Sequence, residues 1–229
     1  MALTSWLDLV FPRVCLVCRS KLTNETALCA KCAAELQPHT SLFCGTCRAR
    51  LPTFKKICHE DTPYLLGAAG DYHNVILRTL LHALKFENIK DAAGPLSQFL
   101  LIYLRALSLD LKDWLVLPIP LHPARERARG FNQALLLAKN VAENLELPIL
   151  DKTLERAKHT RPQIELHDHA LRQANLENAF RVEDADPIRA RNILLVDDIT
   201  TSGATLRTAA RTLRQAGARK IIALAVTKA

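Results

Sequence analysis

The sequence of 229 residues has few aromatic side chains and no apolar run long enough to cross a lipid bilayer. The nearest run, Phe99–Leu107, contains Arg105 and falls well short of the roughly 20 residues that a membrane-spanning helix needs. Aromatic residues make up 5% of the chain, which disfavours an extended platform for stacking nucleic-acid bases. The first residues, Met1–Phe11, include Asp8 and lack a basic start and a small-residue cleavage site. We therefore predict no signal peptide and a cytoplasmic location.

The composition is ordinary for a soluble globular protein, with 49% apolar and 24% charged residues. It argues against a disordered chain, a collagen-like repeat and a long coiled coil. Lys and Arg number 31 against 23 Asp and Glu, so the formal net charge is +8. Such a charge favours an anionic partner, either nucleic acid or a phosphorylated small molecule, although a merely basic surface has the same balance.

No cysteine follows Cys58, so the last three quarters of the chain offer no thiol for catalysis. All seven cysteines lie before that point, which in a cytosolic chain favours metal binding over disulfides. Cys15, Cys18, Cys29 and Cys32 have the spacing C-x2-C-x10-C-x2-C. Two residues between cysteines let both thiolates of a tight turn face one ion, and two such turns complete a tetrahedron of soft ligands. We predict a zinc site, the alternative being reduced or disulfide-linked cysteines.

The cysteine pattern is partly repeated at a constant offset of 29 residues, by Cys44, Cys47 and Cys58. The same offset relates three further pairs, namely Arg19 and Arg48, Leu22 and Leu51, and Leu28 and Ile57. The eighth ligand position falls on Asp61, whose carboxylate can bind zinc, and His59 is the competing fourth ligand. We predict a second zinc site there, the alternative being a decayed repeat held by apolar contacts.

Four protein ligands close a zinc site, so both ions are expected to be structural rather than catalytic. Zinc would replace a hydrophobic core that a segment of roughly 60 residues can hardly build. Pro63 marks a boundary, which predicts a zinc-binding module over residues 1–63 and a second domain over residues 64–229.

Beyond Pro63 the sequence alternates between apolar strands and helices. The expected strands are Leu65–Asp71 (an edge strand), Trp114–Ile119, Lys152–Arg156, Ala179–Val182, Ile193–Val196 and Lys220–Val226. The expected helices are Val75–Phe86, Asp91–Leu107 (capped by Asp91), Phe131–Leu145, His167–Asn175 and Gly203–Ala216, the last ending at a left-handed Gly217. This alternation predicts an α/β fold with a doubly wound, mainly parallel sheet. Ligands of such sheets bind beyond the carboxyl ends of the strands.

The segment Asn192–Leu206 combines a buried strand, two adjacent carboxylates at its end, and a loop of small hydroxyl residues leading into a helix. Asp197 and Asp198 are the carboxylates, and the loop includes Gly203. Free amides and the helix dipole favour a phosphate in such a loop, while carboxylates accept hydrogen bonds from sugar hydroxyls. The combination predicts a ribose 5-phosphate ligand. The alternative is a capped helix after a strand, with no ligand.

This segment resembles the phosphoribosyl pyrophosphate (PRPP) signature of type I phosphoribosyltransferases, with one departure at Thr200, where an apolar residue is usual. Other stretches narrow the resemblance: Leu81–Phe86, Pro118–Arg125, Arg129–Gln133, Thr160–Gln163, Arg172, Asn175 and Ala179–Phe180. Together with the amino-terminal cysteine pairs, they resemble the ComF family of competence-associated proteins, including its GntX-like members. The resemblance covers nearly the whole chain.

The resemblance implies roles for individual residues. Asp197 and Asp198 match the positions that bind the ribose hydroxyls and serve the reaction. The loop that holds the 5-phosphate would comprise Thr200, Thr201, Ser202, Gly203, Ala204 and Thr205. Pyrophosphate would meet Arg125, Arg127 and Arg129, since guanidinium pairs well with phosphate oxygens, unless these form a solvated basic loop. Lys85 is either a phosphate contact or a solvated lysine at a helix end. Residues 160–175, with Arg172 as a catalytic candidate, correspond to a closing hood.

The resemblance further implies natural transformation as the process served, with single-stranded DNA as a partner and PRPP as ligand or regulator. Mg²⁺ would arrive with PRPP and bind mainly through its oxygens. Competence proteins such as a helicase are the expected protein partners. The alternative is an active phosphoribosyltransferase with an unidentified acceptor, for which the sequence shows no nucleobase-specificity segment and no glutaminase cysteine. A third alternative is a scaffold that has kept the fold for partner binding.

Overall fold

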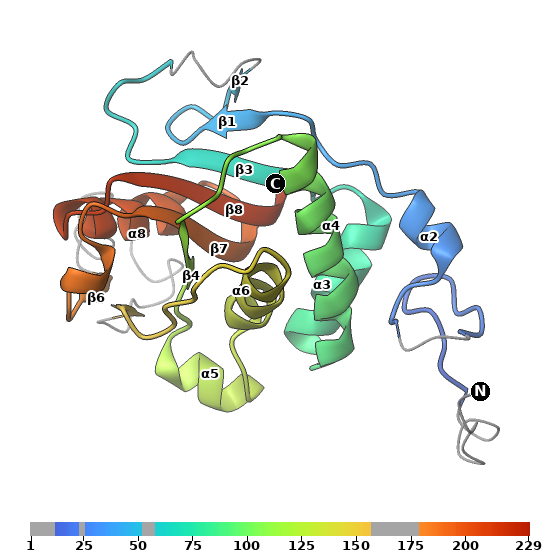
Figure 1. Ribbon diagram of the computed structural model, residues 1–229. Helices are drawn as coiled ribbons and strands as arrows, with labels where there is room; N and C mark the ends of the chain where they lie inside the picture. Colours follow the sequence, from blue (N-terminus) through green and yellow to red (C-terminus); the bar gives the residue numbers. More distant parts are fainter. Residues whose placement is uncertain (1–11, 23–25, 52–57, 157–178) are drawn as a thin grey trace, which may run out of the picture.

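The computed structural model describes residues 12–22, 26–51, 58–156 and 179–229 (Figure 1). Its main sheet has six strands in this part of the chain: β1 (Leu42–Cys44), β2 (Arg50–Leu51), β3 (Leu65–Asp71), β4 (Leu115–Pro118), β7 (Asn192–Thr200) and β8 (Lys220–Lys228). They lie in the order β2-β1-β3-β8-β7-β4. Strands β3, β8, β7 and β4 are parallel neighbours, whereas β1 and β2 are antiparallel additions. The predicted mainly parallel α/β sheet is confirmed.

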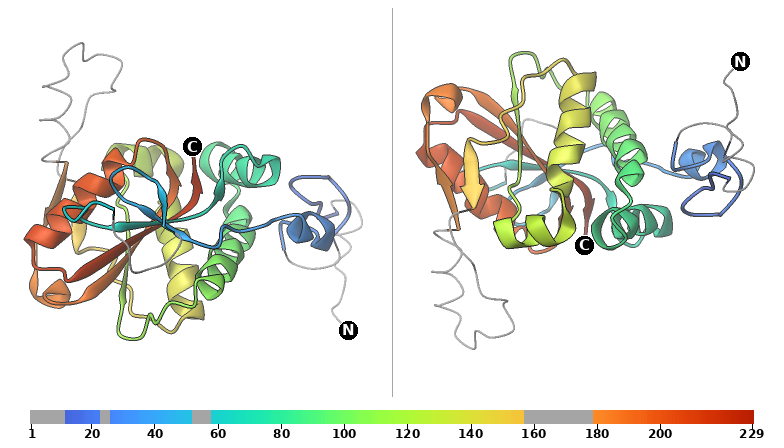
Figure 2. Two further views of the ribbon diagram at one scale, coloured as in Figure 1. Left: turned by 90° about the horizontal axis from the view of Figure 1, so that it is seen from above. Right: turned by 90° about the horizontal axis from the view of Figure 1, so that it is seen from below.

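Helices cover both faces of this sheet (Figures 1 and 2). One face is covered by α3 (Val75–Phe86), α4 (Ala93–Ala106, after the 3-10 turn η1 at Lys90–Ala92) and α6 (Gln133–Asn144). The other face is covered by α8 (Ala204–Gln215). Next to α8 lies a two-stranded hairpin of β5 (Leu154–Arg156) and β6 (Phe180–Val182), followed by the 3-10 turn η3 (Asp186–Ile188).

Strand β7 shows how the sequence divides its side chains between the two faces. Successive side chains of a strand point to opposite sides. Leu194 and Val196 belong to the apolar cluster under α4 and α6, whereas Ile193 and Leu195 belong to the cluster under α8. All four are fully buried, which explains the unbroken apolar run in the sequence.

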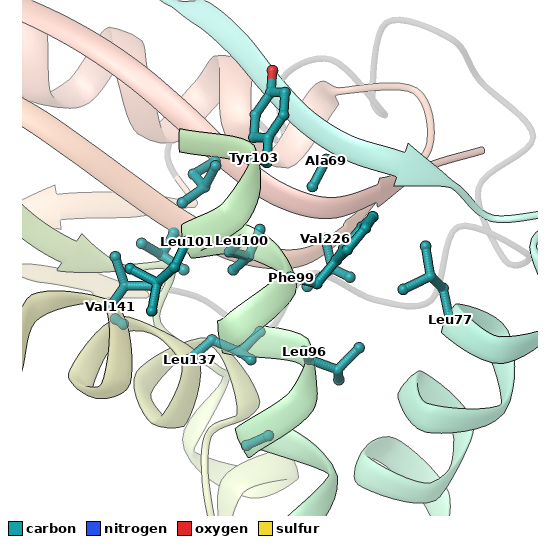
Figure 3. Packing of buried hydrophobic residues seen from close by; sticks show 14 of the residues in the cluster. Ala69, Leu77, Leu96, Phe99, Leu100, Leu101, Tyr103, Leu137, Val141 and Val226 are labelled. Atoms are coloured by element: carbon teal, nitrogen blue, oxygen red, sulfur yellow. The ribbon is translucent and has the colours of Figure 1, made fainter. Parts of the chain in front are cut away.

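Helix α4 packs its apolar face between α3, α6 and the sheet. Figure 3 shows Phe99 between Leu77 of α3 and Val226 of β8, with Leu137 of α6 on the other side of the helix. At the end of α4 the buried Tyr103 hydroxyl donates a 2.8 Å hydrogen bond to the Ser41 carbonyl. This bond joins the helical layer to the chain just before β1.

The hairpin of β1 and β2 extends the main sheet from within the cysteine-rich region. Phe43 pairs with Leu66 and Cys44 with Leu65, so β3 has β1 on one side and β8 on the other. The expectation that Leu65–Asp71 is an edge strand is therefore wrong. The short helix α2 (Ala30–Ala34), in the first cysteine unit, lies apart from the sheet, beyond α3 and α4 (Figure 2).

Most predicted elements are present, with differences at their ends. Helix α4 begins at Ala93, and its N-cap Ala92 has no side-chain cap, so the expected cap by Asp91 is wrong. Gly217 is left-handed at φ +98, as expected. Helix α5 (Pro123–Arg129) was not predicted. The predicted helix His167–Asn175 lies outside the described residues, as do the hood and Arg172.

Among the described helices, none has both the length and the apolarity to cross a membrane.

Candidate functional site

A pocket of about 200 Å³ lies where β7 runs past the end of its neighbour β4. The last β4 pairing joins Pro118 to Val196, whereas β7 continues beside β8 as far as Thr200. This step leaves the end of β7 open on one side, at the carboxyl edge where parallel sheets bind ligands. The pocket is lined by Lys85, Ile119, Pro120, Leu121, Arg125, Arg129, Asn132, Gln133, Ala134, Arg156, Asp197, Asp198, Ile199 and Thr205.

Asp198 occupies the α3 side of the pocket and is paired with Lys85. Its two carboxylate oxygens lie 3.0 and 2.9 Å from the Lys85 ammonium, and one of them also accepts the Ile199 N–H at 2.7 Å. Asp198 is 6% exposed. A buried carboxylate with a paired cation and a backbone donor is held in one orientation, with the remaining lone pairs available to a ligand.

Asp197 lies one residue earlier in the strand and so points to the α8 side. Its carboxylate accepts the Asp198 N–H at 2.8 Å. Burial, followed by the neighbouring Asp198 charge, raises the pKa of Asp197 to about 8. Asp197 therefore keeps its proton near neutral pH, and the pair offers donor and acceptor atoms suited to hydrogen bonds with two adjacent hydroxyls.

Three arginines also line this pocket and are called its basic wall below: Arg125 and Arg129 from α5, and Arg156 from β5. The Arg156 guanidinium lies 5.5 Å from the Phe180 ring centre, and its buried Nε has no partner among the described residues. Burial, followed by the nearby Arg125 charge, lowers the pKa of Arg156, whereas the Asp197 charge raises it, as expected where positive side chains lie near one another and near a carboxylate. A ligand that supplies only acceptor oxygens would satisfy them.

Gln133, at the start of α6, adds a further donor. Its Oε1 accepts a 2.6 Å hydrogen bond from Arg129, while its buried Nε2 has no partner in the described chain. Gln133 is 3% exposed and lines the pocket. Sequence reasoning missed both Arg156 and Gln133 as site residues, because only the folded chain brings β5 and α6 to this pocket. Arg127 is exposed on α5 and does not line it.

The predicted phosphate loop, from Thr200 to Thr205, comes just after the two aspartates in the sequence. The structure places Thr200 inside β7, where it is 3% exposed, rather than in the loop. Gly203 has φ +73 and is the N-cap of α8, with no side-chain cap bond. The Ser202 hydroxyl accepts the Ala204 N–H at 3.3 Å. Among the loop residues Thr205 lines the pocket, so the start of α8 and the carboxylate pair share one site.

The four cysteines of the first unit gather around one point. The sulfur atoms of Cys15, Cys18, Cys29 and Cys32 all lie within 4.8 Å of one another, with Cys18 and Cys29 3.6 Å apart. Tetrahedral zinc with Zn–S bonds near 2.3 Å requires sulfurs about 3.8 Å apart. Hydrogen bonds from Ser20 lower the pKa of Cys18 to about 6, whereas burial and the neighbouring sulfurs raise that of Cys32. A bound cation would let all four ionise together, so the residues fit zinc.

The second unit gathers Cys44, Cys47, Cys58 and His59, again within 4.8 Å. The His59 Nδ1 lies 3.5 Å from the Cys44 sulfur and 3.3 Å from the Cys58 sulfur. The prediction of Asp61 as fourth ligand is therefore wrong, and the competing His59 takes that place. His59 directly follows Cys58, so its ring folds back onto the cluster, whereas Asp61 is exposed outside it. Three thiolates and one imidazole are a common zinc ligand set.

The two units also share backbone structure at the offset of 29 residues. An antiparallel bridge joins Val14 to Lys21 in the first unit, and the equivalent pair, Phe43 and Arg50, is joined in the second. The internal duplication inferred from the cysteine spacing is present in the fold.

Comparison with known proteins gives two domain matches and several relatives. A double zinc ribbon domain matches residues 6–60, and a phosphoribosyl transferase domain matches residues 132–229. The DNA utilization protein YhgH of Salmonella typhimurium is 32% identical over 95% of this chain and 88% of its own. The chain belongs to the ComF family. This confirms the family resemblance seen in its motifs.

Two other ComF relatives are named for competence. Competence protein F of Haemophilus influenzae is 30% identical over 90% of this chain and 93% of its own length. Competence protein ComFC of Bacillus subtilis is 27% identical over 90% and 79%, respectively. The similarity therefore spans both the zinc ribbons and the phosphoribosyltransferase domain, rather than one of them alone.

Proposed function

We propose that this ComF protein binds PRPP in the pocket at the end of β7. The observation that carries this proposal is one small pocket that holds the pair Asp197 and Asp198, three arginines, and two buried donors without a partner in the described chain, Arg156 Nε and Gln133 Nε2. The two carboxylates would accept hydrogen bonds from the ribose hydroxyls. The loop at the start of α8 would hold the 5-phosphate, where free amides and the helix dipole favour an anion. Arg125, Arg129 and Arg156 would bind the pyrophosphate.

Mg²⁺ would enter with PRPP rather than occupy a site of its own. Within the described residues, the clusters of three or more His, Cys, Asp or Glu ligand atoms both belong to the zinc ribbons. The pocket supplies two carboxylates, and one of them already pairs with Lys85. That donor set fits a cation bound mainly through PRPP oxygens. When bound, Mg²⁺ would neutralise charge on the pyrophosphate.

Calorimetric titration of the zinc-loaded protein with PRPP and Mg²⁺ tests the site. We expect micromolar binding that is lost in Asp197→Asn and in Asp198→Asn. Asp186→Asn is the matched control, because Asp186 is exposed and, within the part of the chain that the structure describes, its carboxylate pairs with Arg189 alone. Absence of PRPP binding by well-folded wild-type protein would overturn the proposal.

For the biological role, we propose that the protein handles single-stranded DNA during natural transformation, in the cytoplasm and with partners such as a helicase. Two observations support this: relatives are named for DNA utilization and competence, and the net charge is +8. Binding through phosphates releases counterions, so affinity should fall steeply with salt. Fluorescence anisotropy of a labelled oligonucleotide between low and moderate salt, with duplex DNA as comparison, measures this. Weak binding that does not respond to salt would contradict it.

A second candidate function is active phosphoribosyl transfer to an unidentified acceptor. The basic wall favours it, because arginines that surround a departing pyrophosphate stabilise the charge that develops on it. The test is pyrophosphate release from PRPP across a panel of acceptors, with Asp197→Asn as control. Release that needs an acceptor and disappears in the variant supports turnover, whereas no release across the panel argues for PRPP as a bound ligand only.

A further inference from the structure

The Thr201–Thr205 loop contacts the second zinc ribbon unit through its first residue. Arg48 is the residue after Cys47, and its guanidinium donates a hydrogen bond to the Thr201 carbonyl. In the other direction, Arg207 of α8 donates a 3.3 Å hydrogen bond to the Thr46 carbonyl. The turn that carries two predicted zinc ligands and the loop that would hold the 5-phosphate are thus joined by reciprocal bonds.

Tyr64 fills the space between the same two segments. It is 2% exposed, and a Cβ added to Gly203 would lie 3.1 Å from its hydroxyl oxygen. A Cβ added to Gly45, in the zinc-ribbon turn, would lie 2.3 Å from the Tyr64 carbonyl oxygen. Two glycines therefore allow close approach on either side of Tyr64. The turn, the tyrosine and the loop form one packed unit.

The duplication provides an internal comparison, because Arg19 holds the position in the first unit that Arg48 holds in the second. Both residues are left-handed, with φ of +61 and +60. Both donate their N–H to the carbonyl of the first cysteine of their unit, at 3.0 Å to Cys15 and 2.9 Å to Cys44. The Arg19 side chain is exposed and makes no hydrogen bond with any residue the structure describes. The same turn therefore presents an arginine twice, and only Arg48 reaches the loop.

We propose that Arg48 is a positioning residue for the 5-phosphate, so that the second zinc ribbon is part of the ligand site. The inference rests on the proposed PRPP site. The Thr201 carbonyl and the Ser202 N–H belong to one planar trans peptide and point in opposite directions. Holding the carbonyl toward Arg48 turns the Ser202 N–H away from the zinc ribbon and leaves it available to the proposed phosphate. The described residues of the first zinc ribbon make no such bond to the loop, so we assign that ribbon no such role.

The first test compares Arg48→Met with Arg19→Met, each with zinc content measured to show that both ribbons are intact. Ribose 5-phosphate and inorganic pyrophosphate are the probes. One charged hydrogen bond amounts to about a tenfold change in affinity. We expect Arg48→Met to bind ribose 5-phosphate about tenfold more weakly, and Arg19→Met to bind it like wild type. Pyrophosphate affinity should stay within about twofold in both. Equal ribose 5-phosphate affinity in the two variants overturns the proposal.

A second readout needs no ligand. Hydrogen exchange of the backbone amides over residues 200–206 should be faster in Arg48→Met than in wild type, and unchanged in Arg19→Met. Arg48→Lys, which retains a donor, should restore part of the protection. If wild-type protein binds no ribose 5-phosphate, the PRPP site is refuted, while the exchange data still decide whether Arg48 orders the loop. Identical exchange in all variants overturns the role of Arg48.

Discussion

Lys85 on α3 and Asp198 on β7 are 113 residues apart in the sequence, and their charged groups lie 2.9 Å apart at the pocket. Asp198 is nearly buried, and the Lys85 side chain is 24% exposed. The pair joins α3 to the end of β7, so this part of the pocket forms only when these two distant elements have packed together. In the sequence Lys85 could equally be a solvated lysine, and the structure shows that it is not.

Replacing Lys85 with methionine should destabilise the protein, because it leaves the buried Asp198 carboxylate without its cation. Breaking such a pair from one side costs a few kcal/mol, and partial exposure of the lysine reduces the loss to roughly 1–3 kcal/mol. Urea denaturation at neutral pH measures the change, with Arg78→Met, on the exposed face of the same helix, as control. Equal stability of the two variants would show that the pair contributes nothing.

Asp197→Asn should stabilise the free protein while it abolishes PRPP binding. The pKa of Asp197 is raised from 3.8 to about 8, so between these pH values the folded protein binds more protons than the unfolded chain. Wild-type stability therefore falls as pH rises through this window. Asp197→Asn does not lose stability in this way. Its free energy of unfolding should exceed that of wild type by roughly 1–3 kcal/mol at pH 8 and differ little at pH 4.

Asp198→Asn is a second test of that pH dependence. It breaks the Lys85 pair, so it should lose stability, and it removes a neighbouring charge that raises the pKa of Asp197, so the pH dependence should weaken. Thermal or urea unfolding of both variants across pH 4–8 gives the comparison. Parallel stability profiles for wild type and Asp197→Asn would mean that Asp197 does not hold its proton in the folded protein.

The second zinc cluster predicts different outcomes for two neighbouring residues. His59→Ala removes a ligand atom that lies 3.3 Å from the Cys58 sulfur, so the bound zinc should fall from two ions per chain to one. Asp61→Ala removes an exposed carboxylate outside the cluster and should leave two. Elemental analysis after removal of loosely bound metal decides the matter. Two zinc ions in His59→Ala, with one in Asp61→Ala, would show that Asp61 and not His59 is the fourth ligand.

Elements whose side chains are buried could be predicted from the sequence. The predicted helix Val75–Phe86 has the observed bounds, because its apolar residues recur at helical spacing. Helix α5 was missed since none of its residues is buried, so it has no apolar periodicity. Its limits are set locally, by Pro123 in the first turn, a cap from His122 and a left-handed Gly130. The pairing of β1 with β3 was missed because three residues of strand carry no signal of their partner.

The candidate site was predictable only where it is contiguous in sequence. The strand, the two aspartates and the loop are adjacent, so their chemistry could be recognised together. Arg156 reaches the pocket from β5, and no spacing in the sequence relates it to Asp197. Gln133 follows the predicted Arg129 by four residues, but nothing in the sequence indicates that its side chain is buried at the pocket. The same reason explains Arg48, whose position in the repeat identified a zinc-ribbon turn and not its contact with Thr201.

Arg156→Met should separate the two ends of PRPP. Its guanidinium lines the wall assigned to pyrophosphate, so the variant should bind PRPP at least about tenfold more weakly, a loss typical of one charged hydrogen bond. Ribose 5-phosphate, which lacks pyrophosphate, should bind as in wild type. Arg181→Met is the matched control, because Arg181 is on the paired strand β6 and, among the described residues, forms ion pairs with Glu155 and Glu183 at the surface. Equal weakening of both ligands would place Arg156 elsewhere in the site.

Gly203→Ala should impair both the loop and the protein's stability. Alanine at φ +73 costs roughly 1–2 kcal/mol, and its Cβ would lie 3.1 Å from the Tyr64 hydroxyl, which must then shift. Displacement of the loop should weaken ribose 5-phosphate binding by more than the change in stability alone implies, so binding is measured well below the unfolding temperature. Gly94→Ala is the control, since its Cβ would meet nothing within 4 Å and α4 should tolerate or gain from it. If both variants bind ribose 5-phosphate like wild type, the loop is not where the phosphate lies, and the arginine wall becomes the anion site to test.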